Sequence, residues 1–307
     1  MSEYLRLADS GKNEWWRYLL SVLIIFFSWQ IVGSIPTFLL IAWVKLDPDP
    51  QTDFTAEGHF LGVPTIVSFV IFMLASWTFL AGIWFAVRVL HGRPFLTLIT
   101  PAHRVDWKRL GQGALLWFLL VALAAAVEAL LYPGRYRLTF EPASFLLFLP
   151  LALVLIPIQT SAEELFFRAY LLQGFGRRIR NLWILTFLSG FLFMLPHLLN
   201  PEAQESPLLM AFNYFAIGAL LAYVTLRDGR LELALGIHAA NNLFTGIFAN
   251  YVITVMPTPS LFTVQELDAV YSTVSVLVAI VLFLVFLRPS WPRPTSAQFQ
   301  DVPPPAL

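Results

Sequence analysis

Long apolar segments constrain this chain more than any other feature of its sequence. A bilayer core of ~30 Å requires about 20 apolar residues per helix. The chain contains eight such segments, and none shows the strict alternation of a transmembrane strand. We therefore predict an all-α polytopic membrane protein with eight transmembrane helices. The predicted spans are Tyr18–Val44, Gly62–Ala86, Gly111–Tyr132, Phe145–Tyr170, Leu182–Leu199, Leu208–Leu226, Leu231–Val255 and Ala269–Leu287.

The composition supports this fold class and excludes several functions. Of the 307 residues, 58% are hydrophobic and 12% are charged, whereas a soluble domain carries about 25% charged residues. Lys plus Arg and Asp plus Glu both number 19, so the net charge is zero. This argues against nucleic acid as a partner, because phosphate binding requires a basic excess. The absence of cysteine excludes disulfides, thiol catalysis and thiolate metal sites.

The distribution of Lys and Arg predicts how the chain lies in the membrane. Three of the 19 fall in connections on one side, and Arg168 lies inside a span. Because cytoplasmic loops are enriched in Lys and Arg, the side with the other 15 is predicted to be cytoplasmic, with both termini on it. Those 15 fall in the two terminal segments and in the connections 88–109, 177–181 and 227–230.

We divide the chain into three parts. Residues 1–17 are a cytoplasmic tail, residues 18–287 are a single eight-helix transmembrane domain, and residues 288–307 are a Pro-rich tail. The last part holds six prolines in 20 residues. Proline disfavours helix and the segment has little to bury, so we expect disorder there.

Ionisable side chains inside the predicted spans are concentrated in the second half of the chain. Each costs about 3 kcal/mol near the centre of a bilayer helix. Glu164 and Arg168 are four residues apart and face each other on a helix, a pairing that packing explains as well as function does. Glu163 is rotated from Glu164 by roughly 100° and presents its carboxylate to another helix, which favours a functional role.

Two predicted spans each contribute one histidine, His197 and His238. His238 and Asn242 are four residues apart and share a helix face. Asn241 points elsewhere, and we expect it to form a packing or helix–helix hydrogen bond. The other three histidines fall in predicted loops, where solvation explains them: His59, His91 and His103.

Two further residues border this set. Phe193 lies one turn before His197 and is expected to form a wall of the site. Glu128 lies near the outer end of the third span, where it can reach the membrane interface, and we assign it no role.

Glu163, His197, His238 and Asn242 together suit the hydrolysis of an amide bond. A buried carboxylate can act as a general base toward water, and His197 would position the same water. His238 and Asn242 could donate hydrogen bonds to the developing oxyanion, an interaction worth a few kcal/mol in a dry site. The chain lacks the His-Glu-x-x-His pattern of a zinc-binding helix.

Three motifs occur in order on separate predicted helices: Glu-Glu-x-x-x-Arg at 163–168, Phe-x-x-x-His at 193–197 and His-x-x-x-Asn at 238–242. With them the chain resembles the CPBP family, the CAAX-protease and bacteriocin-processing group of intramembrane proteases, also called the Abi family. The resemblance covers roughly residues 140–250.

The resemblance implies an eight-helix core with a cavity open to the cytosol and glutamate-dependent endopeptidase activity. It implies Glu163 as the base, His197 as its partner on the water, and His238 with Asn242 at the oxyanion, with Glu164 and Arg168 supporting. Eukaryotic members trim prenylated CAAX tails. The implied partners are therefore the lipid bilayer and a peptide or protein substrate, with or without a lipid anchor, and the implied location is a bacterial plasma membrane.

The cofactor and two rival functions stay open at this point. The family is often labelled metalloprotease, and Glu163, His197 and His238 could ligate zinc, but the same residues serve without a metal, which we slightly favour. A transporter or proton relay could use the same polar cluster. A membrane scaffold could use it only to hold helices together.

Overall fold

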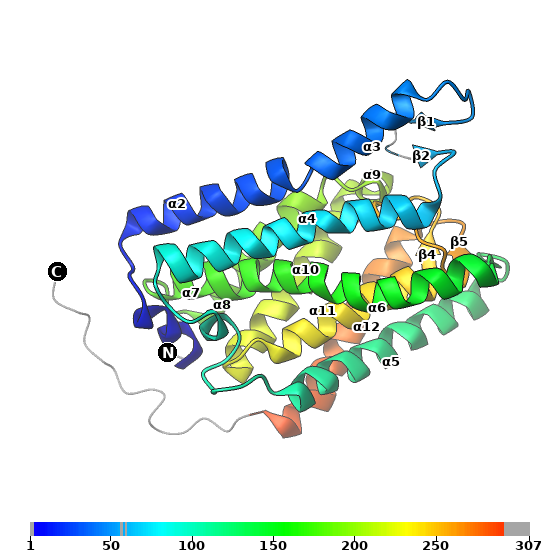
Figure 1. Ribbon diagram of the computed structural model, residues 1–307. Coiled ribbons are helices and arrows are strands. Elements are labelled where there is room, and N and C mark those ends of the chain that lie inside the picture. Colours follow the sequence, from blue (N-terminus) through cyan, green and yellow to red (C-terminus); the bar gives the residue numbers. More distant parts are fainter. Residues whose placement is uncertain (1–2, 56–57, 59, 292–307) are drawn as a thin grey trace.

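The computed structural model describes residues 3–55, 58 and 60–291, and its long helices lie side by side along one direction (Figure 1). The α-helices are α1 (Glu3–Arg6), α2 (Trp15–Phe26), α3 (Ile35–Leu46), α4 (Thr65–Phe85), α5 (Trp107–Leu131), α6 (Pro142–Glu164), α7 (Leu172–Gly176), α8 (Leu182–His197), α9 (Pro201–Glu205), α10 (Pro207–Asp228), α11 (Glu232–Ile247) and α12 (Ala269–Leu287). The π-helical segments are η2 (Phe27–Val32), η3 (Ala86–Leu90) and η5 (Leu165–Leu171). The 3-10 segments are η1 (Leu7–Ser10), η4 (Phe95–Leu98) and η6 (Arg288–Ser290).

The predicted fold class is confirmed. In the described part of the chain, six helical segments are long and apolar enough to cross a bilayer, and α8 is a shorter apolar helix. The protein is an all-α polytopic integral membrane protein. The six segments are Trp15–Leu46, Thr65–Leu90, Trp107–Leu131, Pro142–Gly176, Pro207–Asp228 and Ala269–Leu287. The Pro-rich C-terminal tail lies outside the described residues from position 292 onward.

Two predicted spans are shorter in the structure than in the prediction. α8 and α11 contain 16 residues each, about 24 Å of helix, against a bilayer core of ~30 Å. α8 ends at His197 rather than Leu199. α11 ends at Ile247 rather than Val255, because the residues that follow it leave the helix and pair as a strand.

Short strands gather at one end of the bundle, which we call the strand end (Figure 1). β1 (Asp53–Phe54) and β2 (Phe60–Leu61) pair antiparallel after α3. β5 (Phe262–Val264) lies between β3 (Tyr136–Leu138), to which it is antiparallel, and β4 (Ala249–Tyr251), to which it is parallel. The three-stranded sheet ties the connections before α6 and α12 to the end of α11.

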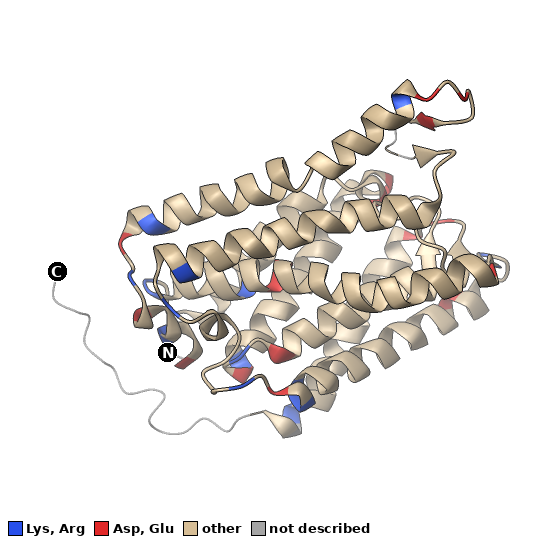
Figure 2. Ribbon diagram, in the orientation of Figure 1, with Lys and Arg blue, Asp and Glu red and all other residues tan. Residues whose placement is uncertain are grey.

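The opposite end, which we call the basic end, holds most of the Lys and Arg side chains (Figure 2). It comprises the N-terminal segment, the start of α5, the end of α7 and the connection between α10 and α11. Arg109 at the start of α5 forms a nearly buried ion pair with Asp228 at the end of α10, with 2.6 Å between Nη2 and Oδ1. The charge asymmetry seen in the sequence therefore corresponds to two physical ends.

The N-terminal segment packs against the basic end. The Tyr4 side chain is fully buried and its hydroxyl donates to the carbonyl of Leu98 at 2.6 Å. The expectation that His91 is solvated is wrong: it is 1% exposed, with Nδ1 2.6 Å from the Lys12 carbonyl and Nε2 2.9 Å from the Tyr170 hydroxyl. Burial lowers the pKa of His91, although the Lys12 carbonyl raises it. His103 is exposed, as predicted.

α11 occupies the interior of the bundle, where it packs against α5, α6 and α10. Ten of its 16 residues are buried. Gly236 faces the backbone of α5 so closely that an added Cβ would lie 2.1 Å from the Leu110 carbonyl oxygen. Gly113 of α5 approaches the Leu233 carbonyl in the same way, at 2.6 Å. Paired small residues allow this close backbone packing, as in other membrane bundles.

The α5–α11 contact gives the first prediction. Gly236→Ala should lower the free energy of unfolding by about 1–3 kcal/mol, because the new methyl group meets backbone rather than a movable side chain. Gly111→Ala is the matched control, since nothing lies within 4 Å of its added Cβ, and it should be neutral or stabilising by up to about 1 kcal/mol. Thermal unfolding in detergent measures both, and equal melting temperatures would refute the packing argument.

Candidate active site

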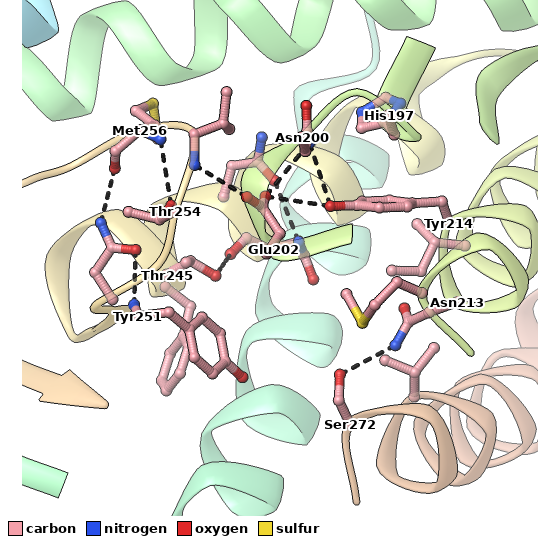
Figure 3. Close-up of a pocket in the computed structure, with 18 of the residues that line it drawn as sticks. His197, Asn200, Glu202, Asn213, Tyr214, Thr245, Tyr251, Thr254, Met256 and Ser272 are labelled. Atoms are coloured by element: carbon pink, nitrogen blue, oxygen red, sulfur yellow. Dashed lines mark hydrogen bonds between the residues drawn. The ribbon is translucent and has the colours of Figure 1, made fainter. Parts of the chain in front are cut away.

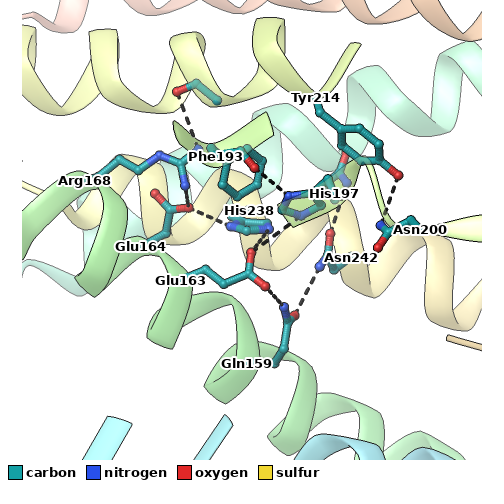
Figure 4. A network of polar contacts seen from close by, with 12 residues as sticks. Gln159, Glu163, Glu164, Arg168, Phe193, His197, Asn200, Tyr214, His238 and Asn242 are labelled. Carbon is teal, nitrogen blue, oxygen red and sulfur yellow. Dashed lines mark hydrogen bonds and ion pairs between the residues drawn. The ribbon is translucent and has the colours of Figure 1, made fainter. Parts of the chain in front are cut away.

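Glu163 and Glu164 are the last two residues of α6, and the π-helical segment η5 begins directly after them. Successive residues of a helix point about 100° apart. The two neighbouring carboxylates therefore extend in different directions and meet different partners (Figure 4). Irregular turns of this kind often occur at functional sites in helices.

Glu164 is the centre of a fully buried polar network. Its Oε1 atom accepts a hydrogen bond from Nη1 of Arg168 at 2.9 Å and lies 2.7 Å from Nδ1 of His238. The side chains of Glu164 and Arg168 are both 0% exposed. The sequence spacing predicted the pair with Arg168, and the structure adds the contact that joins α6 to α11.

Glu163 points toward both histidines but pairs with neither at hydrogen-bond distance. Its Oε2 atom lies 3.7 Å from Nε2 of His238 and 4.0 Å from Nε2 of His197. That oxygen is buried and has no hydrogen-bond partner among the described residues. The structure thus brings together the carboxylate and the two imidazoles that the sequence placed on three separate helices.

In both imidazoles, the group that Nδ1 contacts determines whether Nε2 donates or accepts a hydrogen bond. Nδ1 of His197 lies 2.7 Å from the Phe193 carbonyl, which can only accept, so Nδ1 carries the proton. Nδ1 of His238 faces the Glu164 carboxylate, which likewise accepts. In the neutral form of each ring, Nε2 therefore presents a lone pair toward Glu163.

Phe193 separates the buried cation from the imidazoles. The Arg168 guanidinium lies over the Phe193 ring at 4.0 Å from its centroid. The same ring is 4.2 Å from the His197 ring centroid and 5.7 Å from that of His238. Phe193 is 2% exposed, so it forms the wall expected from its position one turn before His197.

Asn242 reaches the cluster through a residue that the sequence analysis missed. Its Nδ2 donates to Oε1 of Gln159 at 3.2 Å, and Nε2 of Gln159 donates to Oε1 of Glu163. Gln159 lies four residues before Glu163, so a polar side chain on the same face of an apolar span was the available signal. Asn241 accepts from Nε1 of Trp117 at 3.1 Å, which confirms the predicted helix–helix hydrogen bond.

The Glu163 side chain lines a cavity of about 500 Å³ that extends to the strand end. Amide, hydroxyl and carboxylate groups line its outer part (Figure 3). Tyr214 lies against the His197 ring, with 4.7 Å between ring centroids. The sequence places Glu128 near the outer end of its span and gives it no role; in the structure it is 4% exposed, lines the cavity, and accepts hydrogen bonds from Arg135 at 2.9 Å and Tyr136 at 2.7 Å.

The three candidate zinc ligands do not form a metal site as they are placed. Ligand atoms of a tetrahedral zinc with bonds of 2.0–2.1 Å are separated by about 3.3 Å. The Glu163 oxygen is 3.7 Å from His238 and 4.0 Å from His197. Across the described residues, no group of three or more His, Cys, Asp or Glu is arranged to hold a metal ion.

A polytopic helical bundle with this buried cluster of carboxylates and imidazoles is compatible with an intramembrane protease. Residues 142–244 match the family model described as type II CAAX prenyl endopeptidase Rce1-like, a stretch that contains all four predicted catalytic residues. The chain is also 35% identical over 271 residues to the "Uncharacterized protein YyaK" of Bacillus subtilis (strain 168), covering 87% of this chain and 88% of YyaK. The chain belongs to the Rce1-like CAAX endopeptidase family and hydrolyses peptide bonds at the membrane.

The network predicts that two adjacent carboxylates contribute differently to stability. Glu164→Ala leaves Arg168 buried without a counter-ion, which costs about 3–5 kcal/mol. Glu163→Ala removes a carboxylate that forms no ion pair with Lys or Arg among the described residues, so its cost should be much smaller. Thermal unfolding of the two purified variants in detergent compares them. Equal destabilisation would contradict the assignment.

Proposed function

We propose that this protein is a glutamate-dependent intramembrane endopeptidase in which Glu163 activates water for attack on a peptide bond. The observation that carries the proposal is the convergence of one carboxylate oxygen and two imidazole nitrogens within 4.0 Å, inside the bundle. Oε2 of Glu163 and Nε2 of His197 are both acceptors, so together they call for a donor of two hydrogens, which water supplies. A water held there donates one hydrogen to Oε2 of Glu163 and the other to Nε2 of His197.

The reaction then proceeds by general base catalysis. Glu163 accepts a proton from the water while the water oxygen bonds to the carbonyl carbon of the scissile peptide. The tetrahedral intermediate carries its negative charge on the former carbonyl oxygen. When the C–N bond breaks, the protonated Glu163 donates its proton to the leaving amine. His197 acts by orienting the water, because its Nδ1 hydrogen is held by the Phe193 carbonyl.

His238 stabilises the oxyanion in its doubly protonated form. With Nδ1 donating to Glu164, Nε2 becomes a donor only when the ring is an imidazolium. The charges of Glu163, Glu164 and Arg168 sum to minus one, so a positive His238 makes the buried cluster neutral. Asn242 is the second donor, and it must exchange its bond to Gln159 for one to the oxyanion.

No step of this mechanism uses a metal ion, and we propose that the enzyme acts without one. Activity should therefore survive prolonged dialysis against EDTA or 1,10-phenanthroline, with less than about a twofold loss in kcat/KM. Cleavage by the purified, detergent-solubilised protein, together with metal analysis of the same sample, measures this. Loss of activity that returns with added zinc would overturn the metal-free mechanism and leave the assignment as a protease intact.

The orientation and the substrate are part of the proposal. Lys and Arg are enriched in cytoplasmic loops, so we place the basic end and both termini in the cytoplasm and the protein in a bacterial plasma membrane. The residue ranges 1–17, 18–287 and 288–307 are the corresponding tail, membrane domain and tail. The substrate is a membrane-associated peptide or protein, and a comparison of one sequence with and without a prenyl group decides whether lipidation matters.

The catalytic assignment predicts a large and specific loss of activity. Glu163→Gln and His197→Ala should each lower kcat by at least about 10²-fold, because general base catalysis contributes about 10²–10⁴-fold. Both variants should keep wild-type melting temperatures within a few degrees. Quantitative mass spectrometry of membrane-protein termini in cells expressing wild type or Glu163→Gln measures cleavage of whichever membrane proteins are substrates.

The same experiment separates the protease from its two rivals. A transporter or proton relay would show Glu163-dependent transport with no change in protein termini. A scaffold would show reduced stability in Glu163→Gln and no Glu163-dependent activity. Retained cleavage in either catalytic variant would contradict the proposal.

A further inference from the structure

A series of hydrogen bonds runs in one direction from the interior of the bundle to Glu163. Nε1 of Trp117 donates to Oδ1 of Asn241 at 3.1 Å, and Nδ2 of Asn241 donates to Oδ1 of Asn242 at 3.2 Å. Nδ2 of Asn242 donates to Oε1 of Gln159 at 3.2 Å, and Nε2 of Gln159 donates to Oε1 of Glu163 (Figure 4). These bonds join α5, α11 and α6. We call the series the amide chain.

The two ends of the amide chain determine which way its three amides point. An indole N–H can only donate and an ionised carboxylate can only accept. The oxygen of Asn241 must therefore face Trp117, and the nitrogen of Gln159 must face Glu163. Each amide between these ends accepts through its oxygen and donates through its nitrogen. Asn242 consequently turns its oxygen toward Asn241 and its nitrogen toward Gln159.

The Trp117 end of the amide chain is held firmly by packing. Trp117 is 0% exposed, and its ring packs edge-on against Phe283 with 5.8 Å between ring centroids. It lies four residues after Gly113 and so on the same face of α5, where an added Cβ at Gly113 would come within 2.6 Å of the α11 backbone. A buried indole cannot exchange its partner for water, so breaking its bond to Asn241 is costly.

The Glu163 end of the amide chain loses its direction during the proposed reaction. Glu163 takes a proton from water, and a neutral carboxyl group can donate as well as accept. Asn242 also gives up its bond to Gln159 when it turns to the oxyanion. The bond from Asn241 to the Asn242 oxygen remains, and Trp117 fixes the direction of that bond.

We propose that Trp117 and Asn241 are positioning residues for the reaction, which hold the Asn242 amide with its nitrogen toward the developing oxyanion. Both act through Asn242 and take no part in the chemical step. A donor that is oriented before the reaction stabilises the transition state without a cost of reorganisation. The inference rests on the proposed function for the role of Asn242, and it adds a source of orientation, Trp117, that lies outside the cavity lining.

Two changes at position 117 remove the indole donor. Trp117→Phe should lower kcat about fivefold to tenfold, because the net contribution of about one hydrogen bond is lost, and should change KM less than about twofold. Benzothienylalanine at position 117 keeps both rings without the N–H, and it should give the same loss if Trp117→Phe does not fold. Phe283→Leu is the matched control, because it loosens the packing beside the same ring, and it should keep the wild-type kcat.

A double-mutant cycle separates positioning from a general loss of structure. In an Asn242→Ala background the amide that Trp117 orients is absent, so Trp117→Phe should lower kcat less than about twofold further. Cleavage is measured with purified protein in detergent, on a synthetic peptide that spans a cleavage site found by the mass spectrometry of termini. A further loss as large as in the wild-type background, or an unchanged kcat in both position-117 variants, would overturn the inference.

A spectroscopic readout tests the amide chain without cleavage. The Trp117 indole N–H resonance in a proton–nitrogen correlation spectrum is assigned by its absence in Trp117→Phe. Asn241→Leu removes the acceptor and should shift this resonance upfield. Asn242→Ala should shift it less and in the same direction, because hydrogen bonds in a chain polarise one another. An unchanged resonance in either variant would overturn the amide chain, whereas retained cleavage in Glu163→Gln would overturn the proposed function.

Discussion

The ion pair between Glu164 and Arg168 is the interaction on which the arrangement of the site depends. Both side chains are fully removed from solvent, and a charge buried alone in a bilayer protein costs several kcal/mol. Neither group can turn away without stranding the other. Because the same Glu164 oxygen also contacts Nδ1 of His238, the pair fixes the plane of that imidazole and directs its Nε2 toward Glu163. A structural ion pair thereby orients a ring to which we assign a catalytic role.

The adjacent carboxylates of Glu163 and Glu164 can have different roles because successive side chains of a helix point in different directions. Glu164 turns into the protein and has its charge balanced there, whereas Glu163 turns toward the cavity and meets only neutral or titratable groups. A carboxylate that is already saturated by cations makes a poor base, and one without any partner would be costly to bury. Glu163 lies between these two cases. Gln159 donates a hydrogen bond to its Oε1 atom, while its Oε2 atom has no hydrogen-bond partner among the described residues and can accept a proton.

The sequence predicted contacts between residues that are close along the chain, and it did not predict contacts between distant residues. The Glu164–Arg168 pair lies within one helical turn, so its spacing was enough to predict it. The burial of His91 and Glu128 was not predicted because their partners lie far along the chain or in a connecting segment, and hydropathy places both near span ends without showing what covers them. Gln159 was overlooked because a single amide in an apolar span carries no recognised motif. Long-range packing decides these cases.

The two short helices explain why the cavity lies where it does. α8 and α11 both begin at the basic end, and each is about 24 Å long, which is shorter than the bilayer core of ~30 Å. The room left above their final turns is occupied by α9, the connections and the three-stranded sheet, which cannot pack as densely as continuous helices. Hydrolysis consumes water, and a bilayer excludes it. Two helices shorter than the bilayer therefore leave room for the polar residues that line the cavity beside Glu163.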